Sequence, residues 1–423
     1  MTGIFRKTRC LALIIPILCL AVATAAAPAQ ITAANGTSNC TKVGIATVCP
    51  GFNTVKVSFT TPTKTTASVS TSVDKSFALT VLDQRAKKTH NITIPEPPAK
   101  TYNLKVTATP AKGKSSTWIG SFATGVIGSV PAMISSKGNK FLVNGMPLGL
   151  IAVEGYECAT PDYVKDVISM GANILEKGVA APSCDTATLH GALNNQVWWY
   201  SNDPSDQQQP STLGELLQEG STDLTAVADP GSLLGCASKS DLGLYQLVKK
   251  KASEGPVIST IVVTQKLDAS DDNCIDPVRL NSLFWTTFAA GGSGVGYYVR
   301  SGVPGNFSVV PSLPAMAVKD ANELTTLEPC ILNGKSLPVK TDLNGPVKIS
   351  AWQYAGMICV IAANTRNAPV QGTFSLNSKA KTAQVLWAAR SVRMNAGSIS
   401  ESFAPLAVNI YKLLPPVATA AKK

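Results

Sequence analysis

Histidine is scarce in this sequence of 423 residues, which contains only His90 and His190. The cysteines include no C-x-x-C pair, so neither residue type supplies the closely spaced ligands of a zinc site. The sequence also lacks the G-x-x-x-x-G-K phosphate loop and the G-x-S-x-G nucleophile elbow. These absences argue against the protein classes that those motifs define, and we expect neither a metal nor another cofactor.

Acidic residues are outnumbered, with 26 Asp and Glu against 37 Lys and Arg and a net charge of +11. The basic residues are spread thinly, and Lys249, Lys250 and Lys251 form the one compact internal run. A nucleic-acid-binding protein would gather basic and aromatic residues on one face. We therefore expect no nucleic acid partner, and we interpret the charge as an aid to solubility or to loose adhesion to acidic surfaces.

Long apolar runs are absent beyond the amino terminus. There, Arg6, Lys7 and Arg9 precede an apolar run over 11–23 and small residues at 25–27, the pattern of a signal peptide over 1–30. An uncleaved amino-terminal anchor is the alternative interpretation. Both place the rest of the chain outside the cell, secreted or associated with the cell surface, and the mature chain has no predicted membrane span.

Cysteine usage agrees with export. Two of the ten cysteines lie in the predicted signal peptide, which leaves an even number in the mature chain. In an exported protein these are expected to form disulfides rather than metal sites. Sequence order suggests one connectivity among many: Cys40–Cys49, Cys158–Cys184, Cys236–Cys274 and Cys330–Cys359.

The segment 31–130 has the two-residue alternation of strands and no helical period. Apolar residues alternate with polar ones from Val55 to Phe59, from Phe77 to Val81 and from Tyr102 to Val106. These runs predict a small β-sandwich. Their order, with "TVKVSFTTPT" and "YNLKVTATPAKG", resembles a fibronectin type III domain.

Strands and helices alternate over 131–335, which predicts β/α units and a parallel sheet. Apolar strands are expected at 147–153, 172–177, 197–201, 256–265 and 294–299, with helices at 161–170, 187–194, 241–252 and 277–290. The core of this region is shorter than the roughly 250 residues of an ordinary (β/α)₈ barrel. We therefore expect a short or incomplete TIM-type (β/α) barrel.

Strand patterns return over 336–414, where "MICVIAAN" and "LAVNIYKL" are apolar runs. They predict a second antiparallel β-sandwich, followed by a disordered tail over 415–423. The predicted fold class is thus a multi-domain α/β plus all-β protein, with the barrel flanked by two β-sandwiches.

Several segments in this order resemble β-galactosidase-like glycoside hydrolases. "GNKFLVNGMPLGLIAVEGYE" is similar to the hairpin and first barrel strand of that family, and "GAN" to the end of its first helix. "VWWYSNDPSD" is similar to the fourth-strand segment that carries the acid/base, and "PVRLNSLFWTTFAAGGSGVGYYV" to the last helix and strand. The resemblance covers most of 139–414 and implies carbohydrate, an oligo- or polysaccharide or a glycosylated surface, as the partner.

The chain departs from this family where hydrolysis needs two carboxyl groups across the scissile bond. Asp203 stands where the family has Glu, and Gln265, which cannot ionise, stands where a nucleophile is expected. Asp203, Glu154 and Glu176 are the candidate catalytic carboxylates. The candidate binding residues at strand ends, with Tyr297 beside them, are Glu157, Gln265, Tyr298, Arg300 and Trp199.

Each of these residues also has a structural interpretation. Asp203 precedes a proline and fits an ordinary turn. Glu154, Glu157 and Glu176 fit loop charges as well as a pocket lining, and Trp199 fits core packing. His90 lies on a predicted strand and indicates no ligand, and His190 fits a helix surface.

Three functions follow from these alternatives: a divergent glycoside hydrolase, a secreted protein that binds carbohydrate or a cell surface without a catalytic pair, or a structural surface protein whose sandwiches mediate adhesion. A carboxylate pair across one cleft distinguishes the first, and aromatic and amide groups without such a pair distinguish the second. The third requires no cleft.

Overall fold

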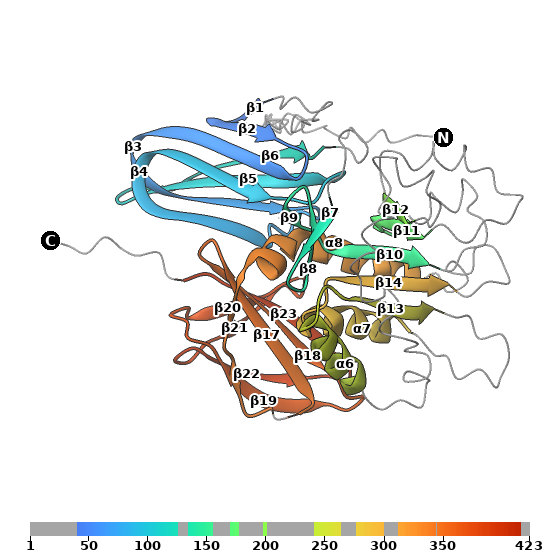
Figure 1. The fold of residues 1–423 in the computed structure, drawn as a ribbon. Coiled ribbons are helices and arrows are strands. Elements are labelled where there is room, and N and C mark those ends of the chain that lie inside the picture. The colour runs from blue at the N-terminus through green and yellow to red at the C-terminus, as the bar shows by residue number, and fades with distance from the viewer. Residues whose placement is uncertain are drawn as a thin grey trace, which may run out of the picture.

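The computed structural model describes residues 40–125, 134–154, 170–176, 198–200, 241–263, 276–299, 312–343 and 345–415. Element labels follow Figure 1. The chain has three parts in sequence order: an antiparallel sheet (β1–β6), a parallel sheet with its helices (β10–β14 and α6–α8), and two further antiparallel sheets (β15–β23).

The amino-terminal part is a sheet of six antiparallel strands. They are β1 (Thr41–Val43), β2 (Ala46–Pro50), β3 (Thr54–Ser72), β4 (Leu79–Pro95), β5 (Thr101–Pro110) and β6 (Ser116–Ala123). The long β3 pairs with β4 on both sides of an interruption at 61–64, with β2 near its start and with β5 near its end. All six strands thus belong to one continuous sheet. The β-sandwich and the resemblance to a fibronectin type III domain stay predictions.

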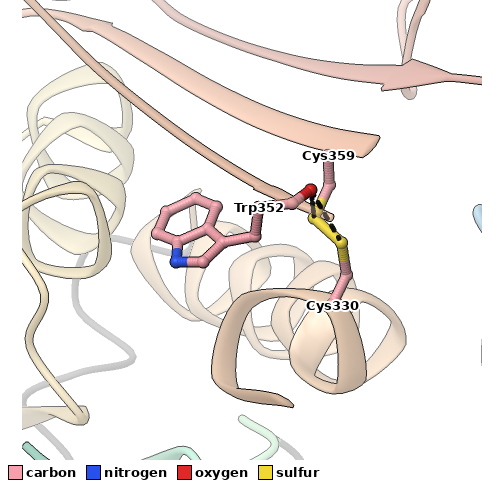
Figure 2. Close-up of a disulfide and its surroundings, with 3 residues drawn as sticks. All are labelled: Cys330, Trp352 and Cys359. Atoms are coloured by element: carbon pink, nitrogen blue, oxygen red, sulfur yellow. Dashed lines mark hydrogen bonds between the residues drawn. A yellow bond between two sulfur atoms is a disulfide. The ribbon is translucent and has the colours of Figure 1, made fainter. Parts of the chain in front are cut away.

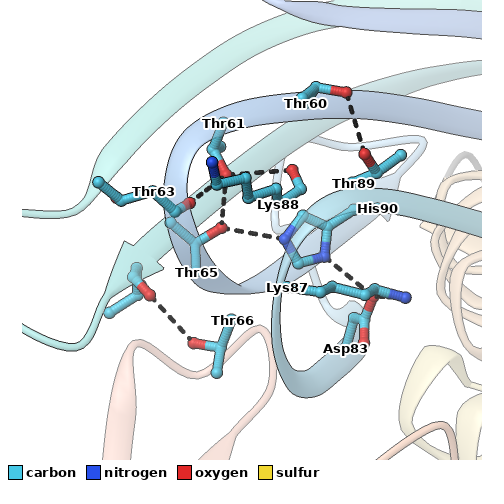
Figure 3. Close-up of polar contacts among 11 residues, drawn as sticks. Thr60, Thr61, Thr63, Thr65, Thr66, Asp83, Lys87, Lys88, Thr89 and His90 are labelled. Atoms are coloured by element: carbon cyan, nitrogen blue, oxygen red, sulfur yellow. Dashed lines mark hydrogen bonds and ion pairs between the residues drawn. The ribbon is translucent and has the colours of Figure 1, made fainter.

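The β3–β4 ribbon is interrupted where its register shifts between Thr60 and Ala67 (Figure 3). Here the buried His90 ring stacks on Phe59 at 4.8 Å, and its two nitrogens lie 2.9 Å from Thr65 Oγ1 and 2.9 Å from Asp83 Oδ2. These contacts give both nitrogens of the buried His90 ring a hydrogen-bond partner at the shift.

A small sheet follows, made of β7 (Ile134–Lys137), β8 (Lys140–Val143) and β9 (Met146–Pro147). Asn144 and Gly145, both with positive φ, form the tight turn between β8 and β9, as the Asn-Gly pair favours. Phe141 and Val143 pack with Leu150 and Ala152 of the next strand in one apolar cluster. The hairpin therefore covers one face of the parallel sheet.

Five parallel strands form the central sheet, in the order β12-β11-β10-β14-β13. They are β10 (Leu150–Glu154), β11 (Ile174–Glu176), β12 (Trp198–Tyr200), β13 (Ile258–Val263) and β14 (Gly294–Val299). Four of them lie within segments predicted to be strands, and β10 extends one residue, Glu154, beyond its predicted segment 147–153. The first strand in sequence thus lies in the middle of the sheet, next to the last one.

Three helices are described: α6 (Leu242–Ala252), α7 (Pro277–Ala289) and α8 (Ser312–Asn333). The sequence predicted α6 and α7 within one residue. Asp276 caps α7 by accepting a hydrogen bond from the Arg279 amide at 2.7 Å, and Pro277 occupies the first turn. Most residues of α7 are buried, because the helix lies between the parallel sheet and the carboxyl-terminal strands.

α8, the longest described helix, was not predicted from the sequence. Pro314 lies in its first turn, where the missing amide has no intrahelical partner. Pro329 lies inside the helix and removes one of its hydrogen bonds. Packing compensates for this loss, because α8 contacts α7, β4, β9, β17 and β18.

The carboxyl-terminal part consists of two antiparallel sheets, ordered β15-β17-β18-β23-β20-β21 and β16-β19-β22. Their strands are β15 (Lys335–Leu337), β16 (Lys340–Thr341), β17 (Val347–Tyr354), β18 (Met357–Asn364), β19 (Val370–Ser375), β20 (Thr382–Val385), β21 (Arg390–Arg393), β22 (Ser398–Phe403) and β23 (Val408–Leu413). Residues of both sheets, among them Val360, Phe374 and Tyr411, form a common core.

Two of the predicted disulfides, Cys40–Cys49 and Cys330–Cys359, are confirmed. Cys330 of α8 is joined to Cys359 of β18, and the Trp352 carbonyl oxygen lies 3.7 Å and 3.9 Å from their sulfur atoms (Figure 2). This bond fixes the helix to the carboxyl-terminal part. The other two predicted pairs, Cys158–Cys184 and Cys236–Cys274, lie outside the described residues. No helix in the described ranges is both long and apolar enough to cross a bilayer.

Candidate functional site

The carboxyl ends of the parallel strands meet along one edge of the central sheet. Glu154 ends β10 and pairs with Tyr298 of β14, while Glu176 ends β11 and pairs with Tyr200 of β12. The two glutamates lie one position beyond the pair formed by Val153 and Leu175. The backbone thus brings Glu154, Glu176 and Tyr298, all predicted site residues, to neighbouring strand ends.

The other predicted site residues are distributed differently. Trp199 pairs with Leu175, one position before the strand ends. Asp203, Glu157, Gln265 and Arg300 lie outside the described residues.

The register also distinguishes the two faces of the sheet. Val153, Ile261 and Tyr297 are buried in the core that contains the side chains of α7 and α8. Leu150 and Ala152, at alternate positions, pack against the β8–β9 hairpin on the opposite face. Because successive residues of a strand alternate between faces, Glu154 occupies a register position of the hairpin-covered face.

Tyr297 was expected to line a sugar site, and the structure corrects this expectation. Its side chain is fully buried on the helix-covered face. Burial raises the pKa of the Tyr297 hydroxyl well above its usual value, and the nearby Asp320 carboxyl adds to the effect. Tyr297 therefore belongs to the core, whereas Tyr298 occupies the alternate position.

Asp320 of α8 is a buried carboxyl group behind the sheet. It accepts a hydrogen bond from Asn281 Nδ2 at 2.6 Å. Burial raises the pKa of Asp320 to about 7 despite the neighbouring Lys319. Lys319 also pairs with Glu323 at 2.8 Å, and the Glu323 side chain lines a hollow of about 160 Å³ with Trp285 and Trp387.

A second buried pair fixes α6 to α7. Arg279 donates to Asp241 Oδ1 at 3.1 Å, and the Ser282 hydroxyl donates to Asp241 Oδ2 at 2.8 Å. Burial raises the pKa of Asp241, while the Arg279 charge and the Ser282 hydrogen bond oppose the shift. The arginine near the start of this helix, part of the resemblance described above, thus has a positioning role here.

Glu96 and Glu328 are buried where the amino-terminal sheet meets α8 and the β8–β9 hairpin. Glu328 Oε1 accepts a hydrogen bond from the Gly149 amide at 2.6 Å. Burial raises the pKa of Glu328 to about 8, although this bond and Lys100 oppose the shift. Burial likewise raises the pKa of Glu96 well above its usual value, and Glu328 adds to it.

The Thr65–His90–Asp83 chain has the order of a nucleophile, a base and an orienting acid. His90 is fully buried and Thr65 is 4% exposed, so no substrate reaches them in this structure. Burial raises the pKa of Asp83, but hydrogen bonds from Lys87 and His90 outweigh it and leave the pKa below its usual value. The cluster is structural, as expected for His90.

Sequence analysis missed the buried acids Glu96, Asp320, Glu323 and Glu328. Three of them belong to α8, and only its recognition as a helix would have placed them beside apolar positions such as Leu324 and Leu327. Glu96 carries no comparable signal, because a Pro-rich turn surrounds it.

No protein-family model matches the sequence, and no curated protein matches it either. Among solved structures, the chain is similar to a glycoside hydrolase family 5 protein from Bacteroides vulgatus, with 11% identity, 69% of this chain and 96% of that chain covered, and a TM-score of 0.40.

The chain is also similar to two α-amylases. For the Anoxybacillus enzyme the identity is 15%, the TM-score 0.33, and the coverage 60% of this chain and 55% of that one. For the Geobacillus thermoleovorans enzyme the values are 14%, 0.36, 61% and 65%. The chain therefore spans less than two thirds of the length of either amylase.

Proposed function

We propose that this protein binds carbohydrate at the carboxyl edge of its parallel sheet, in a site that includes Glu154, Glu176, Tyr200 and Tyr298. Trp199 shares the register row of Val153 and Tyr297, which belongs to the helix-covered face, so it is not part of this site. Asp203, with Glu154 and Glu176, supplies the carboxyl groups available for glycoside hydrolysis. The observation that carries the proposal is the register that places Glu154 and Glu176 at adjacent strand ends, beside two tyrosines.

The strand order supports a (β/α) barrel as the scaffold. In a doubly wound sheet of order 3-2-1-4-5-6, the first strand lies beside the fourth, and the later strands follow in sequence order towards the edge. In this chain β10 instead pairs with β14, the last of the described parallel strands, and β13 lies beyond β14. A barrel closes through a pairing of this kind, and its active site lies at the carboxyl ends of the strands.

The expected spacing suits glycoside chemistry. Neighbouring strands lie about 4.8 Å apart, and retaining glycosidases hold their two carboxyl groups about 5–5.5 Å apart. The tyrosines of the same row, Tyr200 and Tyr298, are residues that stack on sugar rings and donate hydrogen bonds. Glu157, Gln265 and Arg300, on the segments that follow the strands, complete the proposed binding set.

Binding without turnover is the second candidate, and the residue types at two positions favour it. Asp203 is one methylene shorter than the glutamate of the resembling family, and Gln265 cannot act as a nucleophile. A degraded catalytic pair of this kind leaves a protein that retains sugar contacts and loses proton transfer. The disulfides and the predicted signal peptide support an extracellular site of action.

A panel of chromogenic glycosides, measured with the full mature chain, tests hydrolysis, and a glycan array tests binding. For an active enzyme, we expect Glu154→Gln, Glu176→Gln or Asp203→Asn to lower kcat at least a hundredfold on the substrate found. For a binding protein, we expect the same variants to weaken glycan binding without any turnover in the parent.

Glu254→Gln is the matched control, because this glutamate is exposed and, among the described residues, its one ion pair is with Lys251, away from the sheet edge. It should leave both readouts unchanged. The proposal would be contradicted if Glu154→Gln, Glu176→Gln and Asp203→Asn all kept the turnover and glycan binding of the parent. It would also be contradicted if the parent neither hydrolysed a glycoside nor bound a glycan.

A further inference from the structure

A second hollow, of about 510 Å³, lies at the opposite end of the parallel sheet. The turn that precedes β14 lines it on one side and β17 on the other, while α6 and the end of α8 complete it (α6 and β17 are labelled in Figure 1). Its volume falls within the range of about 300–1,000 Å³ that small-molecule sites occupy. We call it the amino-edge groove.

The amino-edge groove is positively charged. Lys140 and Lys249 line it, and none of the described residues that line it is acidic. Lys348 lies next to them, on the same strand as the lining residues Ile349 and Ser350. Within the described part of the chain, none of these three lysines forms an ion pair with a carboxylate.

Two of the lysines crowd one aromatic ring. Lys249 Nζ lies 5.8 Å and Lys348 Nζ 5.3 Å from the centre of the Tyr245 ring. Burial lowers the pKa of Lys348, and the Lys249 charge lowers it further. Burial and Lys137 lower the pKa of Lys140 in the same way. Lys249 and Lys348 therefore repel each other, and an anion between them would relieve this repulsion.

Polar and aromatic groups accompany the lysines. The Ser350 hydroxyl donates to the Ala289 carbonyl at 2.6 Å, which leaves its oxygen free to accept a hydrogen bond from a ligand hydroxyl. Half-buried Trp352 also lines the groove. Because two ammonium groups already lie against Tyr245, the ring is a poor platform for the base stacking that single-stranded nucleic acids require.

We propose that the amino-edge groove binds an acidic oligosaccharide, with a carboxylate or sulfate group held between Lys249 and Lys348 and a second one at Lys140. Hydroxyl donors of the sugar reach Ser350, and a ring face packs on Trp352. This site is separate from the carboxyl edge of the sheet and does not depend on the function proposed there.

Calorimetric titration of the full mature chain with trigalacturonate, at low and at physiological salt, tests this proposal. Neutral galactotriose and inorganic sulfate are the comparison ligands. We expect trigalacturonate to bind, galactotriose not to bind, and affinity to fall with salt because the charges are partly exposed. The double variant Lys249→Gln/Lys348→Gln should lose at least tenfold in affinity, and Lys140→Gln several-fold.

Lys250→Gln is the matched control, because it removes the same charge from the same helix at a position that does not line the groove. It should change affinity less than twofold, and Glu154→Gln should leave this binding intact. Equal losses in Lys250→Gln, no binding of trigalacturonate by the parent, or equal binding of galactotriose would overturn the proposal. A single-stranded oligonucleotide or a phosphopeptide that binds more tightly than trigalacturonate would overturn the saccharide assignment.

Discussion

At the scale of single residues, Glu328 combines full burial with a hydrogen bond from the Gly149 amide. Its folded-state pKa of about 8 lies above the ordinary 4.5 of a glutamate. The folded state therefore holds a proton that the unfolded state releases between these pH values. This stabilising contribution is complete below about pH 4.5 and disappears as the pH rises towards 8.

Glu328→Gln should weaken this pH dependence. The amide oxygen can still accept the Gly149 hydrogen bond, but the side chain no longer ionises. We expect the free energy of unfolding, measured with urea from pH 5 to pH 8, to fall less steeply in the variant, with a gain of roughly 2 kcal/mol or more at pH 8. Glu254→Gln, at an exposed position, should reproduce the parent curve; an unchanged slope in Glu328→Gln would refute the argument.

At the scale of elements, the close approach of the segment before β11 to α8 depends on Gly171. Its φ of +78° is in the left-handed region, and an added Cβ would lie 2.5 Å from Ala321 Cβ of the helix. Gly145, in the β8–β9 turn, has the same φ of +78° with no atom within 4 Å of an added Cβ. Substitutions at the two glycines therefore distinguish the cost of the backbone conformation from the cost of steric overlap with α8.

Gly171→Ala should destabilise the protein more than Gly145→Ala does. The control substitution carries only the left-handed backbone cost of about 1–2 kcal/mol. Overlap with α8 adds a further 1–3 kcal/mol or so, as overpacking generally does. Urea unfolding of both variants measures the difference in the free energy of unfolding. Equal losses in the two variants would contradict the argument, because they would mean that α8 moves away from the added methyl group without a loss of stability.

The same elements show how far local sequence signals reach. Apolar runs and caps predicted the central strands and the helices α6 and α7, because these segments carry their own periodicity and punctuation. α8 was not predicted, because it contains Pro314 and Pro329 and prolines are typical of helix ends and loops. Its contacts with strands distant in sequence stabilise it. The amino-edge groove was not predictable, because Lys140, Lys249 and Lys348 come from three segments that only the tertiary fold brings together.

The candidate site was predictable in part. The glutamates and aromatic residues at strand ends follow from the strand pattern, and their order across the sheet follows only from the pairing of β10 with β14. Nothing in the sequence distinguished Tyr297 from Tyr298, because the face that the helices cover depends on the register.

At the scale of the whole molecule, one apolar core extends through all three parts. It includes Val57 of the amino-terminal sheet, Leu327 of α8 and Ile361 of the carboxyl-terminal part. Polar contacts join the outer parts directly, since Lys412 Nζ donates to the Phe77 carbonyl at 2.9 Å and Trp387 Nε1 to Asp74 at 2.5 Å. The parts should therefore unfold together rather than as independent domains.

Leu327→Ala tests this coupling. Loss of a fully buried leucine costs about 2–5 kcal/mol, and hydrogen exchange should speed up in β4 and in β18 alike, because α8 contacts both. Leu376→Ala removes a leucine from the separate carboxyl-terminal core and should affect that part first. Faster exchange confined to α8 in the Leu327 variant would show that the three parts are independent.

The position of β10 between β11 and β14 also bears on how the chain acquires its shape. Because the chain is synthesised from its amino terminus, the β1–β6 sheet can form early, since its strands are neighbours in sequence. β10 has to wait for β14, well over a hundred residues later, before both of its edges are paired. During that interval its unpaired edge is open to wrong partners, so mispairing of β10 should lower the yield of folded protein even where the completed fold is stable.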